Sequence, residues 1–248
     1  MVFGKYKRPV KNNHQNSKDN KEHRGKTNKT IKPVNCIYGQ DIDDHMNYIF
    51  PSRNTGLHID PSGVKYQIDL NIMYPIDDEP YYVLYTQGMS NVDMILPEGV
   101  ESEFPEFKRA ELFMMLPDTW DIENMVSTFP KHESYWPMQL MRMIARYHYE
   151  FFTWVAPGYT MEYSSFASNT KLNSAMLVSL GDDISIIKTK ADKPISLYLV
   201  LPLYREEVRY KIKHGYDKFI EMFIKEFSFN NPESWIIDVN RKNLGLEQ

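Results

Sequence analysis

The sequence predicts an α+β fold in which helices pack on a mixed, largely antiparallel sheet. Three observations support this prediction. Short apolar runs rich in aromatic and sulfur-containing residues end at glycine or proline, which is typical of strands buried on both faces. Residues 65–74 alternate apolar and polar side chains, which predicts a half-buried strand. Residues 137–151 have the spacing of an amphipathic helix.

The first half of the chain predicts a helix followed by a hairpin. Residues 41–50 suit a short helix, with acidic residues in its first turn and Pro51 at its end. The strand at 65–74 and a strand at 81–86 follow, joined by an acidic turn. The side chains expected on the buried face of the first strand are Tyr66, Ile68, Leu70, Ile72 and Tyr74.

The second half predicts the rest of the sheet and two helical regions. Further strands are expected at 110–116, 172–180, 184–187 and 195–201, with a tight connection at 181–183. Pro137 suits the first turn of the helix that continues to residue 151. Residues 202–227 are expected to be mostly helical, with an interruption at Gly215. The apolar stripe of helix 137–151 contains Leu140, Met141, Ile144, His148 and Phe151, and its opposite side contains Arg142, Arg146 and Glu150.

Composition sets the outer limits on the class of protein. A chain of 248 residues with 42% hydrophobic content can bury one substantial core. The single cysteine, Cys36, excludes an internal disulfide framework and favours a reducing compartment. Neither a membrane-spanning apolar stretch nor an apolar block behind the charged N-terminus is present. We therefore expect a cytoplasmic protein with no membrane partner.

Charge divides the chain into two parts. Residues 1–33 carry ten Lys or Arg and two Asp or Glu, whereas the remainder has a net charge of −12. The first segment has few large apolar residues, so we predict a flexible basic arm at 1–33 and a folded domain at 34–248. The arm could contact nucleic acid, a ribosome or an acidic partner, but a solvated tail is the favoured interpretation.

No segment contains a familiar catalytic motif. The sequence lacks a glycine-rich phosphate loop, a Gly-x-Ser-x-Gly elbow and the usual spacings of zinc ligands. His58 and Asp60 would share one face of a strand, but no third ligand accompanies them. We therefore predict no catalytic residue, no metal and no cofactor.

Glu111 is the carboxylate that requires a separate explanation, because it lies inside an apolar strand. A desolvated glutamate would have a raised pKa that suits acid–base chemistry. The alternative, which we favour, is that its side chain faces solvent or pairs with Arg142 or Arg146.

Aromatic residues are abundant at the expected ends of elements. They are Trp120, Trp136, Phe152, Trp154 and Tyr159, each close to a proline or glycine. Tyrosine and tryptophan commonly anchor protein interfaces, although the rim of a packed core explains the same pattern.

Five segments, in order, together span most of residues 56–215. They are Tyr81–Ser90 with Pro97–Gly99, Arg109–Pro117 with Trp120, Trp136–Arg146 with Trp154 and Gly158, Asn169–Leu172, and Leu201–Glu207. These segments resemble the suppressor-of-fused domain, and the chain resembles the single-domain type found in bacteria.

The resemblance implies a role in binding another protein. Bacterial single-domain members are interpreted as immunity proteins, so our first hypothesis is a non-catalytic protein that neutralises a cognate toxin by stoichiometric binding. The acidic domain favours a basic partner. The alternatives are a regulatory scaffold that sequesters a peptide or transcription factor, and an unrecognised hydrolase using Glu111 or His58 with Asp60. The residues expected to bind the partner are Gly88, Met89, Ser90, Glu111, Trp120, Trp154, Tyr159, Asn169 and Lys171.

Overall fold

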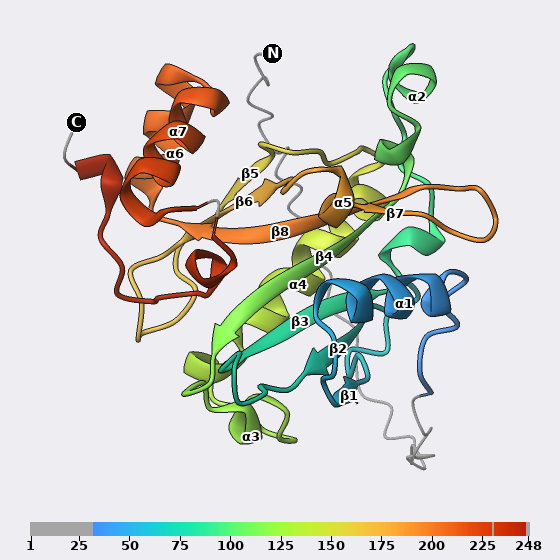
Figure 1. Cartoon of the computed structure of the whole chain (residues 1–248), viewed down its shortest axis with the longest axis horizontal. Helices are drawn as coiled ribbons and strands as arrows, with labels where there is room; N and C mark the ends of the chain where they lie inside the picture. The colour runs from blue at the N-terminus through green and yellow to red at the C-terminus, as the bar shows by residue number, and fades with distance from the viewer. Residues whose placement is uncertain (1–31, 230, 247–248) are drawn as a thin grey trace, which may run out of the picture. The chain divides into compact units, whose positions relative to one another are not determined.

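A mixed sheet forms the centre of the computed structural model, which describes residues 32–229 and 231–246 (Figure 1). Within these residues the strand order is β1-β2-β3-β4-β8-β6-β5, and β7 pairs with β8 outside this path. The strands are β1 Thr55–His58, β2 Asp69–Met73, β3 Tyr81–Gln87, β4 Ala110–Pro117, β5 Thr160–Glu162, β6 Ser174–Val178, β7 Ile186–Ile187 and β8 Ile195–Leu203.

The strands pair antiparallel except at the centre of the sheet. There β4 and β8 run parallel, from Ala110 opposite Ser196 to Phe113 opposite Leu199. The predicted class, α+β with a mixed and largely antiparallel sheet, is therefore confirmed.

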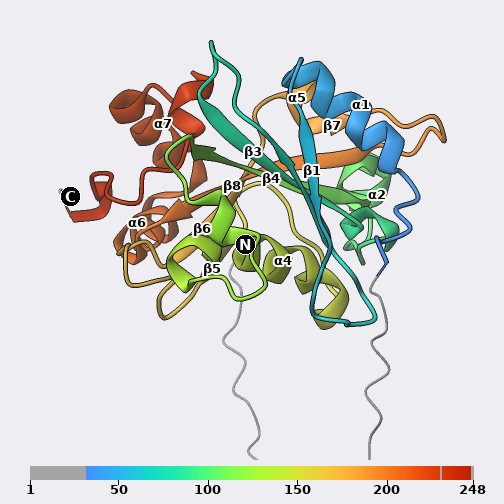
Figure 2. The same ribbon diagram turned by 90° about the horizontal axis from the view of Figure 1, so that it is seen from below.

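Helices cover both faces of the sheet (Figure 2). Helix α4 (His132–Phe151) packs on one face with the core that includes Leu84 and Leu112. Helices α1 (Gly39–Ile49) and α7 (Tyr216–Phe227) pack on the other face with the core that includes Val83 and Phe113. The remaining helices are η1 Met89–Asn91, α2 Val100–Glu103, η2 Pro105–Lys108, α3 Ile122–Met125, α5 Asp182–Ser185, α6 Arg205–His214, η3 Pro232–Trp235 and η4 Leu244–Leu246.

The expectation of a half-buried strand at 65–74 is wrong. Strand β2 spans only Asp69–Met73, and all five residues are buried. Because helices cover both faces of the sheet, the polar residues of β2 are enclosed as well. The carboxylate of Asp69 accepts hydrogen bonds from the backbone N–H of Val34 at 2.7 Å and of Asp60 at 2.9 Å.

Helix α4 begins earlier than predicted and contains Pro137 in its interior. Proline has no N–H, so it cannot bond the carbonyl of Glu133 four residues earlier. The side-chain amide of Asn169 donates to that carbonyl at 3.2 Å instead. The predicted faces also need correction, because Phe151 is exposed whereas Arg142 is buried and donates to backbone carbonyls near β1 and β2.

The C-terminal region returns to the sheet. As predicted, Gly215 separates two helices, α6 and α7, with a φ of +95°. After α7 the chain runs beside the end of β4, where the N–H of Ile237 donates to the carbonyl of Met115 at 2.9 Å. Glu207 on α6 is fully buried and pairs with Arg241 at 2.6 Å.

Most of the predicted basic arm, residues 1–31, lies outside the described residues. Its end contacts the segment before β2, since the carbonyl of Lys32 accepts from the side chain of Gln67 at 2.9 Å. Among the described residues, no helix has both the length and the apolar character needed to cross a bilayer.

Candidate functional site

The structure separates the predicted partner-binding residues into three places. Gly88, Met89, Ser90 and Glu111 lie together in the interior where β3 ends. Trp154 lies on an exposed aromatic surface, with Tyr159 half-buried nearby in the chain. Trp120 and Asn169 line a groove at another part of the molecule, and Lys171 is exposed on the loop that follows Asn169.

Glu111 is fully buried and its carboxylate accepts four hydrogen bonds. One oxygen accepts from the N–H of Gly88 at 3.1 Å, the N–H of Ser90 at 3.0 Å and the hydroxyl of Ser90 at 2.7 Å. The other accepts from the hydroxyl of Thr86 at 2.6 Å. Burial raises the pKa of Glu111 to about 7, although hydrogen bonds from Ser90 and Thr86 act in the opposite direction.

The expectation that Glu111 faces solvent or pairs with an arginine is therefore wrong. The two arginines proposed as partners bind Asp60 instead: Arg146 forms a close ion pair with it, and Nε of Arg142 lies 3.9 Å from its carboxylate. Arg142 also lies 2.8 Å from Nδ1 of His58. In the part of the chain that the structure describes, no group of three or more His, Cys, Asp or Glu side chains could hold a metal.

The turn after β3 requires a glycine at position 88. Its φ of +114° lies in the region that favours glycine, and an added Cβ would be 2.7 Å from the carbonyl oxygen of Gln67. Met89 and Ser90 follow in helix η1 and are buried. Glu111 thus holds the turn from inside the protein, through four hydrogen bonds from Thr86, Gly88 and Ser90.

An exposed aromatic surface lies where η2 meets the loop after α4. We define it by Ile95, Phe104, Phe107, Phe152 and Trp154. Phe104 stacks on Phe107 with ring centroids 5.2 Å apart, and Phe107 approaches Trp154 at 6.2 Å. The segment between η1 and α2 is joined to the loop after α4, because the N–H of Ile95 donates to the carbonyl of Thr153 at 3.4 Å. Ile95 is 59% exposed and Phe152 77% exposed, so large apolar groups face solvent here.

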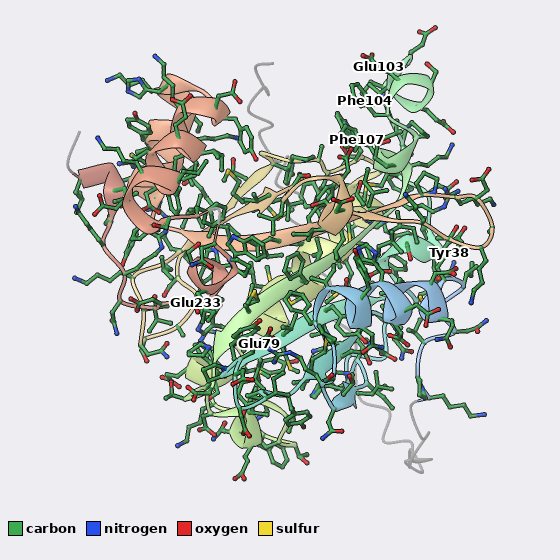
Figure 3. All side chains as sticks on the ribbon, in the orientation of Figure 1. Tyr38, Glu79, Glu103, Phe104, Phe107 and Glu233 are labelled. Carbon is green, nitrogen blue, oxygen red and sulfur yellow. The ribbon has the colours of Figure 1, made fainter. Side chains whose placement is uncertain are left out.

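Carboxylates lie on the segment that carries Phe104 and Phe107. Figure 3 shows Glu103, Phe104 and Phe107 together on the α2–η2 segment, which projects away from the sheet. Gly99, with a φ of +85°, precedes α2, and Pro105 begins η2, so this segment turns outward instead of joining a strand. The acidic residues of the segment are Glu98, Glu101, Glu103 and Glu106. Lys108 pairs with Glu101, so the aromatic surface combines apolar anchors with the negative charge of Glu98, Glu103 and Glu106.

Tyr159 belongs to a neighbouring aromatic cluster. Its ring lies 5.5 Å from that of Tyr147, which lies 4.6 Å from Phe151. Burial, together with a hydrogen bond to Tyr147, raises the pKa of Tyr159 above its ordinary value. Its phenol therefore stays neutral at physiological pH and acts as an apolar group with a polar tip.

Sequence reasoning missed Phe104 and Phe107, which form a stack in which Phe104 is exposed and Phe107 is half-buried. The signal that could have found them is their position beside Pro105, in a short segment with four glutamates and a preceding Gly99. Such a segment has too few apolar residues for a strand, so its aromatic residues have no place in the core.

The family model for the suppressor of fused protein (SUFU) matches residues 65–242. The chain belongs to the suppressor of fused family. The resemblance predicted from the five segments is thus confirmed, and the match extends to the C-terminal segment beside β4.

One curated relative of this SUFU-family chain is an uncharacterized protein of Ureaplasma parvum serovar 3. It is 28% identical over 144 residues, which cover 55% of this chain and 62% of the relative. The chain thus spans less than two thirds of the length of that protein.

Solved SUFU structures share the fold. The chain matches a crystal structure of a Sufu–Fu complex with a TM-score of 0.57 at 14% identity, over 84% of this chain and 92% of that chain. A putative SUFU homolog from Neisseria gonorrhoeae matches with a TM-score of 0.53 at 13% identity, over 83% and 96%. Drosophila Suppressor of Fused matches with a TM-score of 0.56 at 14% identity, over 86% of this chain and 52% of that chain.

Proposed function

We propose that this SUFU-family domain is a non-catalytic protein that binds another protein, and that it acts as an immunity protein by occupying a cognate toxin one-to-one. The observation that supports this proposal is the aromatic surface with its surrounding carboxylates. One structural neighbour is a complex of Sufu with Fu, which supports a protein as the partner.

The physical mechanism combines anchoring with electrostatic attraction. Phe104 and Trp154 offer large rigid groups of the kind that dominate binding energy at protein interfaces. The glutamates on α2 and η2 favour a basic partner, since complementary charge raises the association rate. A toxin that acts on nucleic acid presents such a basic face.

The hydrolase alternative receives less support from the geometry. Glu111 is enclosed without contact to solvent, and His58 and Asp60 are bound by Arg142 and Arg146. The scaffold alternative predicts the same aromatic surface but a short linear ligand.

The test uses the product of the adjacent gene, expressed alone and together with this chain. We expect that product to be toxic by itself, to be neutralised by this chain and to form a one-to-one complex by calorimetry. The Phe104→Ala/Phe107→Ala double variant should weaken the complex by about 100-fold. Phe129→Ala is the matched control, because Phe129 is 90% exposed and lies outside the aromatic surface.

Two outcomes would overturn the proposal. The first is that the adjacent product is harmless or is not rescued by this chain. The second is that Phe129→Ala weakens the complex as much as the double variant does. Binding of a short peptide in place of a folded toxin would favour the scaffold.

A further inference from the structure

A second surface lies apart from the aromatic surface, at the end of β4 where the C-terminal segment returns to the sheet. It is an open groove of about 710 Å³ between the residues after β4, the start of α4 and the C-terminal segment. Figure 3 shows Glu233 on η3 at this part of the molecule. The groove residues used below are Trp120, Asp121, Glu133, Glu233, Ile236 and Asp238.

The charged side chains that line this groove, which we call the acidic groove, are all carboxylates among the described residues. Four carboxylates line it, those of Asp121, Glu133, Glu233 and Asp238, and none of the described residues that line it is lysine or arginine. A hydrogen bond from Ser168 lowers the pKa of Glu133, so this carboxylate is ionised at neutral pH. The groove therefore presents concentrated negative charge beside an aromatic ring.

An apolar cavity of about 200 Å³ adjoins the groove, and residues Ile236, Ile237 and Asp238 line both. A cavity of ~150 Å³ accommodates a molecule of the size of benzene, so this one has room for a large apolar side chain. Its walls are mostly apolar: Leu172, Leu201, Pro202, Phe223, Phe227 and Trp235.

Arg241, which also lines the cavity, does not oppose a cationic ligand. Its guanidinium forms two hydrogen bonds of 2.6 Å with the fully buried carboxylate of Glu207, so its charge is balanced inside the protein. Lys131 lies close enough to Glu133 to interact with its charge but does not line the groove, so the charged groups that line the groove are its four carboxylates.

We propose that the acidic groove and the apolar cavity together bind an extended, positively charged segment of a partner protein, with one apolar side chain in the cavity and lysine or arginine side chains along the carboxylates. Two observations support this occupant: the carboxylates favour a cation, and the adjoining cavity has room for an apolar group beside it. The proposal goes beyond the proposed function, since it concerns another face and holds whether or not the partner is a toxin.

The test measures binding of a fluorescein-labelled peptide, Lys-Arg-Lys-Leu-Lys-Arg-Lys, to the full chain by fluorescence polarisation at low and high salt. We expect one-to-one binding that weakens with salt, and a loss of about tenfold when alanine replaces the central leucine of the peptide. Asp121→Asn/Asp238→Asn should weaken binding of the leucine peptide by about tenfold or more.

The matched control, Glu98→Gln/Glu103→Gln, removes the same charge from the aromatic surface and should leave peptide binding unchanged. Ile236→Phe, which fills the cavity, should abolish the preference for leucine over alanine while retaining the dependence on salt. Circular dichroism of each variant checks that it is folded.

The proposal is overturned if both pairs of charge variants weaken binding equally, because the attraction is then that of the whole acidic domain. It is also overturned if leucine and alanine peptides bind alike, or if the chain forms a dimer through this face in place of binding peptide. Since the aromatic surface is intact in the groove variants, toxin binding can fail or succeed independently of these results.

Discussion

The Glu111→Gln variant tests how the buried carboxyl of β4 couples stability to pH. Burial raises the pKa of Glu111 from an ordinary 4.5 to about 7 in the folded protein. At pH values between 4.5 and about 7, the carboxyl of Glu111 retains in the folded state a proton that it has lost in the unfolded chain. The contribution of Glu111 to the free energy of unfolding is therefore fully present below the unfolded pKa, and it is lost as the pH rises through the folded pKa.

The magnitude follows from the separation of the two pKa values. Each unit of separation between the two pKa values corresponds to about 1.4 kcal/mol, so the contribution of Glu111 to the free energy of unfolding should fall by about 3 kcal/mol between pH 4.5 and 7. Glutamine has no such proton to lose. Its carbonyl can accept from Gly88 and Ser90, and its amide can donate to Thr86, whose hydroxyl lies 3.5 Å from the carbonyl of Leu112. The variant should therefore fold and have a flatter pH profile.

The assay is urea unfolding followed by tryptophan fluorescence, repeated across this pH interval for both proteins. The stability of Glu111→Gln relative to the wild type should rise by about 3 kcal/mol as the pH increases. Glu98→Gln, at an exposed position, is the control and should follow the wild-type profile. Parallel profiles for Glu111→Gln and the wild type would refute the reasoning, because they would mean that the four hydrogen-bond donors keep Glu111 ionised throughout.

Three further substitutions test structural roles by urea unfolding. Arg241→Ala leaves the carboxylate of Glu207 buried and unpaired, and should cost about 3–5 kcal/mol; a loss under about 1 kcal/mol would contradict the role of this pair. Gly88→Ala places a Cβ against the backbone at a φ of +114° and should cost about 1–3 kcal/mol, so an unchanged midpoint would argue against strain in this turn. Asn169→Ala removes the donor to the carbonyl of Glu133 and should cost about 1 kcal/mol, with faster amide hydrogen exchange at the start of α4; unaltered exchange there would speak against this contact.

The sequence predicted the central strands and the terminal helices well. Strands β3 and β4 are continuous apolar runs that end at Gly88 and Pro117, and such runs are informative because both faces of each strand are buried. Gly215 separates α6 from α7 at the predicted position. These features depend on local composition, which a single sequence displays directly.

The features that were missed depend on contacts between distant segments. The burial of Asp69 depends on coverage by helices far away in the chain, which the alternation of 65–74 does not reveal. The donors to Glu111 come from residues 86–90, across the strand pair. Asn169 was selected through the family resemblance, but its bond to the carbonyl left free by Pro137 joins two elements that only the fold brings together.

The same limit applies to the candidate site. Trp154 could be predicted from its position beside a Pro-Gly pair, whereas the stack of Phe104 on Phe107 could not, because it depends on how the α2–η2 segment projects. Residues 233–239 form one wall of the acidic groove. They lie there because Ile236 pairs with Met115 near the end of β4, and no local sequence pattern indicates this contact.

The parallel pairing of β4 with β8 has a consequence for biosynthesis. Ala110 pairs with Ser196, which is 86 positions later in the chain. One edge of β4 therefore has no strand to pair with until the ribosome has added the intervening residues. At 5–20 residues per second this delay is roughly 4–17 s. During that time the nascent chain presents an open hydrogen-bonding edge on a strand of apolar residues, which is a template for aggregation. Production of this protein should therefore depend on chaperones that shield nascent chains, and slower translation between the two strands should lower its yield.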